Sequence, residues 1–248
     1  MNFPDPQFYL SQPPAVVDRG PWLATSTGGM WSILSPHPDD VDIRNIAAGL
    51  SRECRYAGQL KDDADFLAVA EHSAIMAVYA VETGIAKTLE DALAILLHDA
   101  SEAFFGDMPT PVKALLPDFR LIEDHAQNVI MMGFGLVPGN VGITKAGIKS
   151  LDSRICIDER AVGLEDPART IGLNAIWERD PEAKGLERKV RCLSSREARV
   201  DFLETFVWLC ETLPSSTPAA DLIAVQLEHA VSALVSMGER SPEISPAW

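Results

Sequence analysis

The sequence predicts an all-α protein, and three observations support this. Apolar residues recur at intervals of three and four along most of the chain, which is the spacing of one face of a helix. Glycine and proline separate these stretches into segments of helix length, and we find no convincing alternation of apolar and polar residues of the kind that predicts strands. Apolar residues form 47% of the 248 residues, enough for a sizeable core.

The first half of the periodic region predicts three helices joined by short turns. Asp42 can cap a helix over residues 42–56, because its side chain accepts from backbone N–H groups of the first turn. A second helix is expected over 67–84, ending at a glycine. A third is expected over 88–99, and its body is apolar on all sides, which indicates a buried helix.

Four further helices are expected in the second half of the chain. The periodic stretches cover residues 117–133, 144–164, 197–213 and 218–236. The intervening residues 165–196 are polar and irregular, which indicates an insertion or a lid. The last two helices each carry an apolar face. These faces either pack inward or join two chains in a homo-oligomer, and the sequence leaves both open.

These elements divide the chain into an irregular N-terminal arm, a helical core, a polar insertion or lid, C-terminal helices that pack on the core, and a tail. Their expected bounds are residues 1–40, 41–164, 165–196, 197–238 and 239–248.

Charge and composition exclude several classes of function. The formal net charge of -15 repels a phosphate backbone, so long nucleic acid is not an expected partner. The N-terminus lacks the pattern of a signal peptide, and no apolar stretch reaches membrane-spanning length, which predicts a cytoplasmic protein without membrane attachment. The four cysteines form no CxxC pair and are expected to be buried, reduced thiols.

The pair His98–Asp99 at the end of the buried third helix is the first sign of chemistry. Burial of unpartnered polar groups costs a few kcal/mol each, so these residues need a partner. Imidazole and carboxylate together suit a first-row transition ion such as Mn, Co, Fe, Ni or Zn. His72 on the preceding helix and Asp152 on a later helix can approach the same point in a helical bundle.

Five separated blocks of sequence are similar to one known family. The blocks are Cys-Arg-Tyr (54–56), Val-Ala-Glu-His-Ser (69–73), Leu-His-Asp-Ala-Ser-Glu-Ala (97–103), Gly-Asp-Met-Pro-Thr-Pro-Val-Lys (106–113) and Lys-Ser-Leu-Asp (149–152). With these blocks the chain resembles the HD-domain phosphohydrolase superfamily, and most closely its branch of bacterial 5'-deoxynucleotidases and phage-type HD hydrolases. The resemblance covers roughly residues 30–163 and implies an HD-domain helical bundle.

The resemblance implies a centre that binds one divalent transition metal ion, with Mg as a further candidate. It assigns His72, His98, Asp99 and Asp152 as the ligands. Glu102 then corresponds to a glutamate that activates water or protonates the leaving group. The alternative for Glu102 is a solvated residue on the surface of its helix.

The resemblance also implies four residues that meet the substrate. Arg55 matches an arginine that holds phosphate, and Lys113 is a further phosphate-binding candidate. Asp107 matches an acidic residue near the scissile phosphate and the sugar, and it is the second catalytic candidate, for proton transfer beside Glu102. Tyr56 can meet the base or sugar. The structural alternatives are a surface ion pair for Arg55, a surface role for Lys113, a turn cap for Asp107 and a core aromatic for Tyr56.

The implied activity is hydrolysis of a small nucleotide. A 5'-deoxynucleotidase would release phosphate from a deoxynucleoside monophosphate, whereas a triphosphohydrolase would release triphosphate and needs further cations, for which Lys61, Arg120 and Lys149 are candidates. A non-catalytic nucleotide-binding module would lack a ligand or the catalytic glutamate, and all of these are present. A cyclic-nucleotide phosphodiesterase fits the matching blocks less well.

Overall fold

The structure, a computed structural model, describes residues 19–165, 184–215 and 220–239, and helices form most of them. The prediction of an all-α fold is therefore confirmed. The helices are α2 (Ile43–Leu50), α3 (Val69–Glu82), α4 (Leu89–Leu96), α5 (Glu102–Phe105), α6 (Thr110–Lys113), α7 (Pro117–Gly133), α8 (Lys145–Gly163), α10 (Ser195–Thr212) and α11 (Ala220–Ser236), with short 3-10 turns η1 (Pro38–Asp40) and η2 (Arg55–Gly58).

Several expectations fall on residues outside the described ranges. These are the start of the arm (1–18), most of the predicted lid (166–183), the first residues of the last helix (218–219) and nearly all of the tail (240–248).

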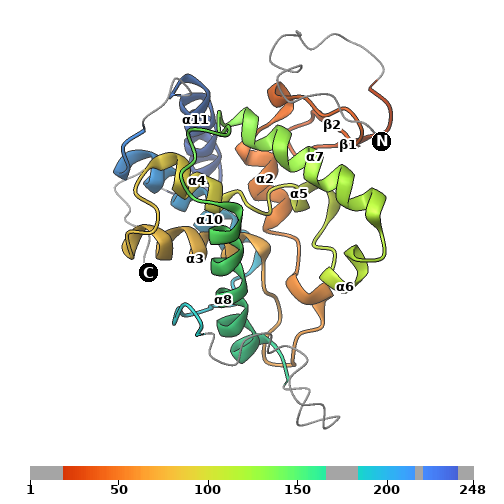
Figure 1. Ribbon diagram of the computed structural model, residues 1–248, viewed down its shortest axis with the longest axis vertical. Coiled ribbons are helices and arrows are strands. Elements are labelled where there is room, and N and C mark those ends of the chain that lie inside the picture. Colours follow the sequence, from red (N-terminus) through yellow and green to blue (C-terminus); the bar gives the residue numbers. More distant parts are fainter. Residues whose placement is uncertain (1–18, 166–183, 216–219, 240–248) are drawn as a thin grey trace.

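Helix α3 lies at the centre of the packing. All but a few of its residues are buried, and it contacts α2, α4, α8 and α10. Its alanines allow neighbouring helices to approach closely, which suits a helix that is covered on several sides. Figure 1 shows α3 grouped with α4, α10 and α11 on one side of the molecule, while α2, α5 and α7 lie on the other.

The C-terminal helices complete the core. Phe202 and Phe206 of α10 are fully buried, and Phe206 packs edge-on against Phe134 at the end of α7. Gln226 of α11 clamps the start of α2, since it accepts from the backbone N–H of Ile43 (2.8 Å) and donates to the carbonyl of Val41 (2.9 Å). A buried amide that uses both its donor and its acceptor avoids the cost of an unpaired polar group.

The arm is more regular than the sequence predicted. Strands β1 (Trp22–Ala24) and β2 (Met30–Ser32) form an antiparallel hairpin. Each strand has three residues, too short for an alternating pattern to be recognised. The buried Trp31 stacks on Phe104 of α5, with ring centroids 4.1 Å apart, so the hairpin helps to position α5.

Two predicted helix ends were also wrong. The helix expected over 42–56 ends at Leu50, because residues 53–55 instead pair with residues 67–69 as a short antiparallel bridge. The helix expected over 88–99 ends at Leu96, so His98 and Asp99 stand in the following turn. The bridge and the turn are both tertiary features, which overrode the local helical periodicity.

Among the described helices, none combines the length and the apolar character needed to cross a bilayer. The four cysteines are unpaired, but each is partly exposed rather than fully buried as predicted.

Candidate metal centre and adjoining cavity

The turn after α4 that carries His98 and Asp99 is held by an amide from α7. Gln127 accepts a hydrogen bond from the backbone N–H of Ser101 (3.0 Å) and donates one to the carbonyl of Leu97 (2.6 Å). The side chain therefore brackets the turn on both sides. No pattern in the sequence indicates this role, because Gln127 lies 26 and 30 residues after the two backbone groups that it bonds.

Four predicted ligands converge at this turn from three directions. His72 comes from α3, Asp152 from α8, and His98 and Asp99 from the turn. The shortest donor-atom separations are 3.0 Å between His98 Nε2 and Asp99 Oδ2 and 3.4 Å between the two Nε2 atoms. His72 Nε2 lies 3.5 Å from Asp152 Oδ1 and 3.8 Å from Asp99 Oδ2.

These separations fit a single ion. Ligand atoms about 2.1 Å from a metal lie about 3.0–3.4 Å from one another in octahedral or tetrahedral geometry. The group formed by His72, His98 and Asp99 can therefore hold a metal ion, and Asp152 lies within reach of the same point.

Each histidine uses its second ring nitrogen in the way expected of a metal ligand. His98 Nδ1 lies 2.9 Å from the carbonyl of Ile95, which can only accept, so Nδ1 carries the proton. His72 Nδ1 lies 2.7 Å from the carboxylate of Glu159. A carboxylate or carbonyl on the far nitrogen fixes the ring and leaves Nε2 to the metal.

The electrostatics favour ionised carboxylates at the centre. Burial would raise the pKa of Asp99, but the neighbouring His98, His72 and Arg55 bring it well below its usual range. Burial would likewise raise the pKa of Asp152, but His72 and His98 lower it more, so the pKa of Asp152 lies below its usual value. Burial lowers the pKa of His98 but Asp99 raises it more, so a proton on Nε2 competes with a metal ion for the same place.

Arg55 enters the site from η2. The short bridge between residues 53–55 and 67–69 ties it to the start of α3, with its backbone N–H donating to Leu67 (2.9 Å). Its guanidinium is buried and lies 4.0 Å from Asp99. Tyr56 follows with φ of 58°, a left-handed backbone that non-glycine residues rarely adopt and that is often found at functional sites.

The opposite wall carries the predicted acid-base residues. Glu102 on α5 is buried rather than solvated, and Lys113 of α6 donates to its Oε1 (3.0 Å). Burial, followed by the charges of Asp99 and Asp107, raises the pKa of Glu102 well above its usual range despite Lys113. Its Oε2 has no hydrogen-bond partner among the described residues. Burial and Asp99 also raise the pKa of Asp107, although Arg55 opposes this.

The position of Glu102 depends on a close helix contact. A Cβ atom on Gly49 of α2 would lie 2.3 Å from the carbonyl oxygen of Ala103 and 2.6 Å from its Cα. Only glycine lets the two backbones approach this closely, so α2 supports α5 directly.

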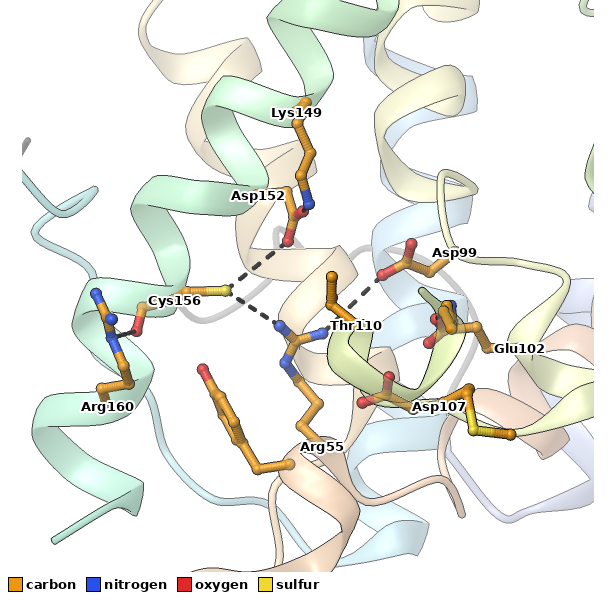
Figure 2. Close-up of a pocket in the computed structure, with 12 residues that line it drawn as sticks. Arg55, Asp99, Glu102, Asp107, Thr110, Lys149, Asp152, Cys156 and Arg160 are labelled. Carbon is orange, nitrogen blue, oxygen red and sulfur yellow. Dashed lines mark hydrogen bonds and ion pairs between the residues drawn. The ribbon is translucent and has the colours of Figure 1, made fainter. Parts of the chain in front are cut away.

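These walls enclose a cavity of about 260 Å³ beside the metal ligands. Figure 2 shows Arg55 rising between the face of α8, on one side, and Asp99, Glu102 and Asp107 on the other. The residues lining the cavity are Arg55, Tyr56, Asp99, Glu102, Asp107, Met108, Thr110, Lys113, Lys149, Asp152, Cys156 and Arg160.

The α8 wall contains two residues that sequence reasoning missed, Cys156 and Arg160. They follow Asp152 at intervals of four, and Lys149 lies three positions before it, so all four share a face of α8. That polar stripe could have been recognised from the spacing. Burial raises the pKa of Cys156 to about 11, so its neutral thiol is a weak hydrogen-bond donor toward Asp152 (3.9 Å) rather than a nucleophile.

Of the three further cations that a triphosphate site would need, one lies at the cavity and two do not. Lys149 lines the cavity and pairs with Asp152. Lys61 instead pairs with Asp63 (3.5 Å), and neither Lys61 nor Arg120 is among the described residues that line the cavity. Of the nine residues singled out as ligands, acid-base groups or substrate contacts, seven line this cavity. The other two, His72 and His98, lie behind the lining with their Nε2 atoms close to Asp99.

Comparison with known proteins places the chain beside two bacterial relatives. No family model matches it. The chain is 34% identical over 146 residues to the uncharacterized protein YfdR of Escherichia coli (strain K12), covering 58% of this chain and 74% of YfdR. It is 33% identical over 133 residues to an uncharacterized protein of Rhodobacter capsulatus, covering 53% of this chain and 67% of that protein. The chain therefore belongs to the same protein family as YfdR.

Proposed function

We propose that this protein is a metal-dependent phosphohydrolase of the HD type that releases phosphate from a deoxynucleoside monophosphate. The observation that carries the proposal is the convergence of His72, His98, Asp99 and Asp152 on one point. That point adjoins a cavity lined by cations and by a buried carboxyl group. Metal ligands, phosphate-binding cations and a proton-transfer group are the parts that metal-dependent hydrolysis of a phosphate ester uses.

The ligand set suits an ion such as Mn, Co, Zn, Fe or Ni, and such an ion supplies Lewis acidity and a water of lowered pKa. Arg55 and Lys113 would bind the phosphate oxygens and stabilise their charge during the reaction. Glu102 would move the proton, because burial beside Asp99 and Asp107 raises the pKa of its carboxyl well above the usual range and lets it hold a proton. Asp107 and Tyr56 would contact the sugar and base.

The size and charge of the cavity favour the monophosphate over the triphosphate. Its volume of about 260 Å³ lies below the usual range for ligand pockets, roughly 300–1,000 Å³. Lys113 and Lys149, moreover, are already paired with Glu102 and Asp152. A triphosphate needs more room and more unpaired positive charge than a monophosphate does.

Two alternatives remain as outcomes of the test. A triphosphohydrolase would use the same ligands and release intact triphosphate, and the cations on α8 (Lys149 and Arg160) are the feature that favours it. A nucleotide-binding module without turnover would keep the cavity but hydrolyse nothing.

The test is product analysis after metal removal. Metal-stripped protein would receive Mn, Co, Zn or Mg and a panel of deoxynucleoside mono- and triphosphates, with products separated by chromatography and Asp99→Ala run in parallel. Nucleoside plus inorganic phosphate from monophosphates supports the proposal, and nucleoside plus triphosphate supports the alternative enzyme. No turnover with any metal overturns both enzymatic alternatives, and full activity in Asp99→Ala overturns the assignment of the metal centre.

A further inference from the structure

The carboxylate of Glu159 is fully buried on α8 and accepts hydrogen bonds from three groups of the site. His72 Nδ1 lies 2.7 Å from Oε1, while Arg55 Nε (3.0 Å) and the Tyr56 hydroxyl (2.9 Å) donate to Oε2. This carboxylate is also the ion-pair partner of the Arg55 guanidinium. One anion therefore contacts a metal ligand and two groups at the substrate side.

We infer that Glu159 is a positioning residue that couples metal binding to phosphate binding. This inference rests on the proposed function, since it assigns His72 to the ion and Arg55 to the phosphate. By accepting a hydrogen bond from the Nδ1–H group of His72, Glu159 turns the unprotonated Nε2 toward the other ligands. By accepting from Arg55 Nε, it leaves the two terminal nitrogens of the guanidinium facing Cys156 and Asp99 at the cavity wall.

The substitution Glu159→Gln separates this role from simple space filling, because a glutamine has nearly the same shape but only one acceptor oxygen. All three neighbours present N–H or O–H donors. If the glutamine NH2 faces His72, that ring must shift its proton to Nε2 and loses its lone pair for the metal. If the NH2 faces Arg55 and Tyr56, it cannot accept their hydrogen bonds, and the guanidinium loses the acceptor that orients it. Either orientation damages one half of the coupling.

The chain offers a matched control. Glu71 on α3 is also fully buried, but its carboxylate accepts from the backbone N–H groups of Arg191 (2.6 Å) and Leu193 (2.9 Å), which lie away from the cavity lining. Glu71→Gln thus makes the same chemical change in an equally buried carboxylate without touching a ligand's hydrogen bond.

The first experiment measures Co²⁺ binding to metal-stripped protein by its visible absorption and by competition with a chelator, without any nucleotide. We expect Glu159→Gln to bind Co²⁺ about 10–100-fold more weakly than the wild type and to show an altered spectrum. Glu71→Gln is expected to stay within about twofold of the wild type. Wild-type affinity in Glu159→Gln, or an equal loss in both variants, overturns the inference.

A second measurement needs no variant and so holds if Glu159→Gln fails to fold. Nitrogen-15 NMR of the histidine rings in the zinc-loaded wild-type protein should show zinc on Nε2 of His72 and a slowly exchanging proton on Nδ1. Zinc on Nδ1, or a His72 ring without zinc, overturns the inference.

These readouts separate the inference from the proposed function. If Glu159→Gln binds Co²⁺ more weakly but the wild type hydrolyses no nucleotide, the proposed function is wrong and the positioning role stands. If the wild type hydrolyses nucleotides but Glu159→Gln binds Co²⁺ as tightly as the wild type, the positioning role is wrong and the proposed function stands.

Discussion

Two fully buried glutamates, Glu159 and Glu71, accept hydrogen bonds from different kinds of donor. Glu159 accepts from side chains of the site, namely His72, Arg55 and Tyr56. Glu71 accepts from the backbone of residues 184–194, which we call the strap, and fastens the strap to α3. In the sequence both are simply glutamates on predicted helices. The structure sets one against side chains of the candidate site and the other against the backbone of the strap.

The difference shows how a buried charge should be interpreted. A carboxylate satisfied by backbone N–H groups holds a segment in place, whereas one satisfied by ionisable side chains fixes their orientation and protonation. Because Glu71 and His72 are neighbours on α3, the two functions meet in consecutive residues. Variants on the site side should therefore change activity or metal binding, and variants on the strap side should change stability.

The largest effect is expected for Asp99→Ala on the site side. Loss of this ligand removes a carboxylate lying 3.0 Å from His98 Nε2, and with it most metal-dependent stabilisation of the transition state. Hydrolysis should fall about a thousandfold or more, measured as phosphate release under saturating metal. The metal-free protein should stay folded but lose some stability, because Asp99 pairs with His98 and Arg55 there. A collapse of folding would instead place Asp99 among the structural residues.

Glu102→Gln should lower kcat by roughly 10²–10⁴-fold, because the amide cannot take up or deliver a proton. Co²⁺ affinity should be nearly unchanged, since Glu102 is bonded to Lys113 rather than to the ligand group. Steady-state kinetics together with Co²⁺ titration measure both quantities. A variant that loses Co²⁺ binding along with activity would show that Glu102 belongs with the ligands.

Sequence reasoning named the residues around the cavity, but it did not name the residues that hold them in place. Periodicity located α7 at its observed bounds, and the nine site residues meet around one cavity. Glu159 and Gln127 escaped prediction because their roles depend on which residues face them across helices, and a pattern within one helix carries no such information. The hairpin escaped because its strands are only three residues long.

Glu71→Gln should destabilise the fold by about 1.5–3 kcal/mol, because it replaces a charged acceptor of two backbone N–H groups by a side chain with one acceptor. Urea unfolding of the metal-free protein measures this loss. Destabilisation well under 0.5 kcal/mol, an order-of-magnitude limit for ordinary surface changes, would mean that the strap does not depend on Glu71.

The smallest expected effect is a pH dependence of the free energy of unfolding that arises where the strap meets α10. Arg191 of the strap pairs with Asp201 of α10 (2.7 Å), but burial raises the pKa of Asp201 to about 6 from 3.8. The folded state thus binds more protons than the unfolded state between these values, so this group's stabilising contribution is present below pH 3.8 and is lost as pH rises through 6. The loss should be about 1–2 kcal/mol after allowance for solvent screening.

Asp201→Asn should remove this pH dependence, because an amide does not titrate. Urea unfolding at pH 5 and pH 8 would compare the two proteins, and the variant should gain stability relative to the wild type at the higher pH. Parallel pH profiles for the two proteins would contradict the assignment of this titration to Asp201.

The most direct test of the central claim is a metal titration followed by activity. Co²⁺ or Mn²⁺ would be added stepwise to metal-stripped protein, and hydrolysis of a deoxynucleoside monophosphate would be recorded at each step. We predict that activity rises in proportion to bound metal and saturates at one ion per chain, and that Asp152→Ala shifts the titration to much higher metal concentration. Full activity in the metal-stripped protein with excess chelator, or no activity at any metal concentration, would contradict the claim.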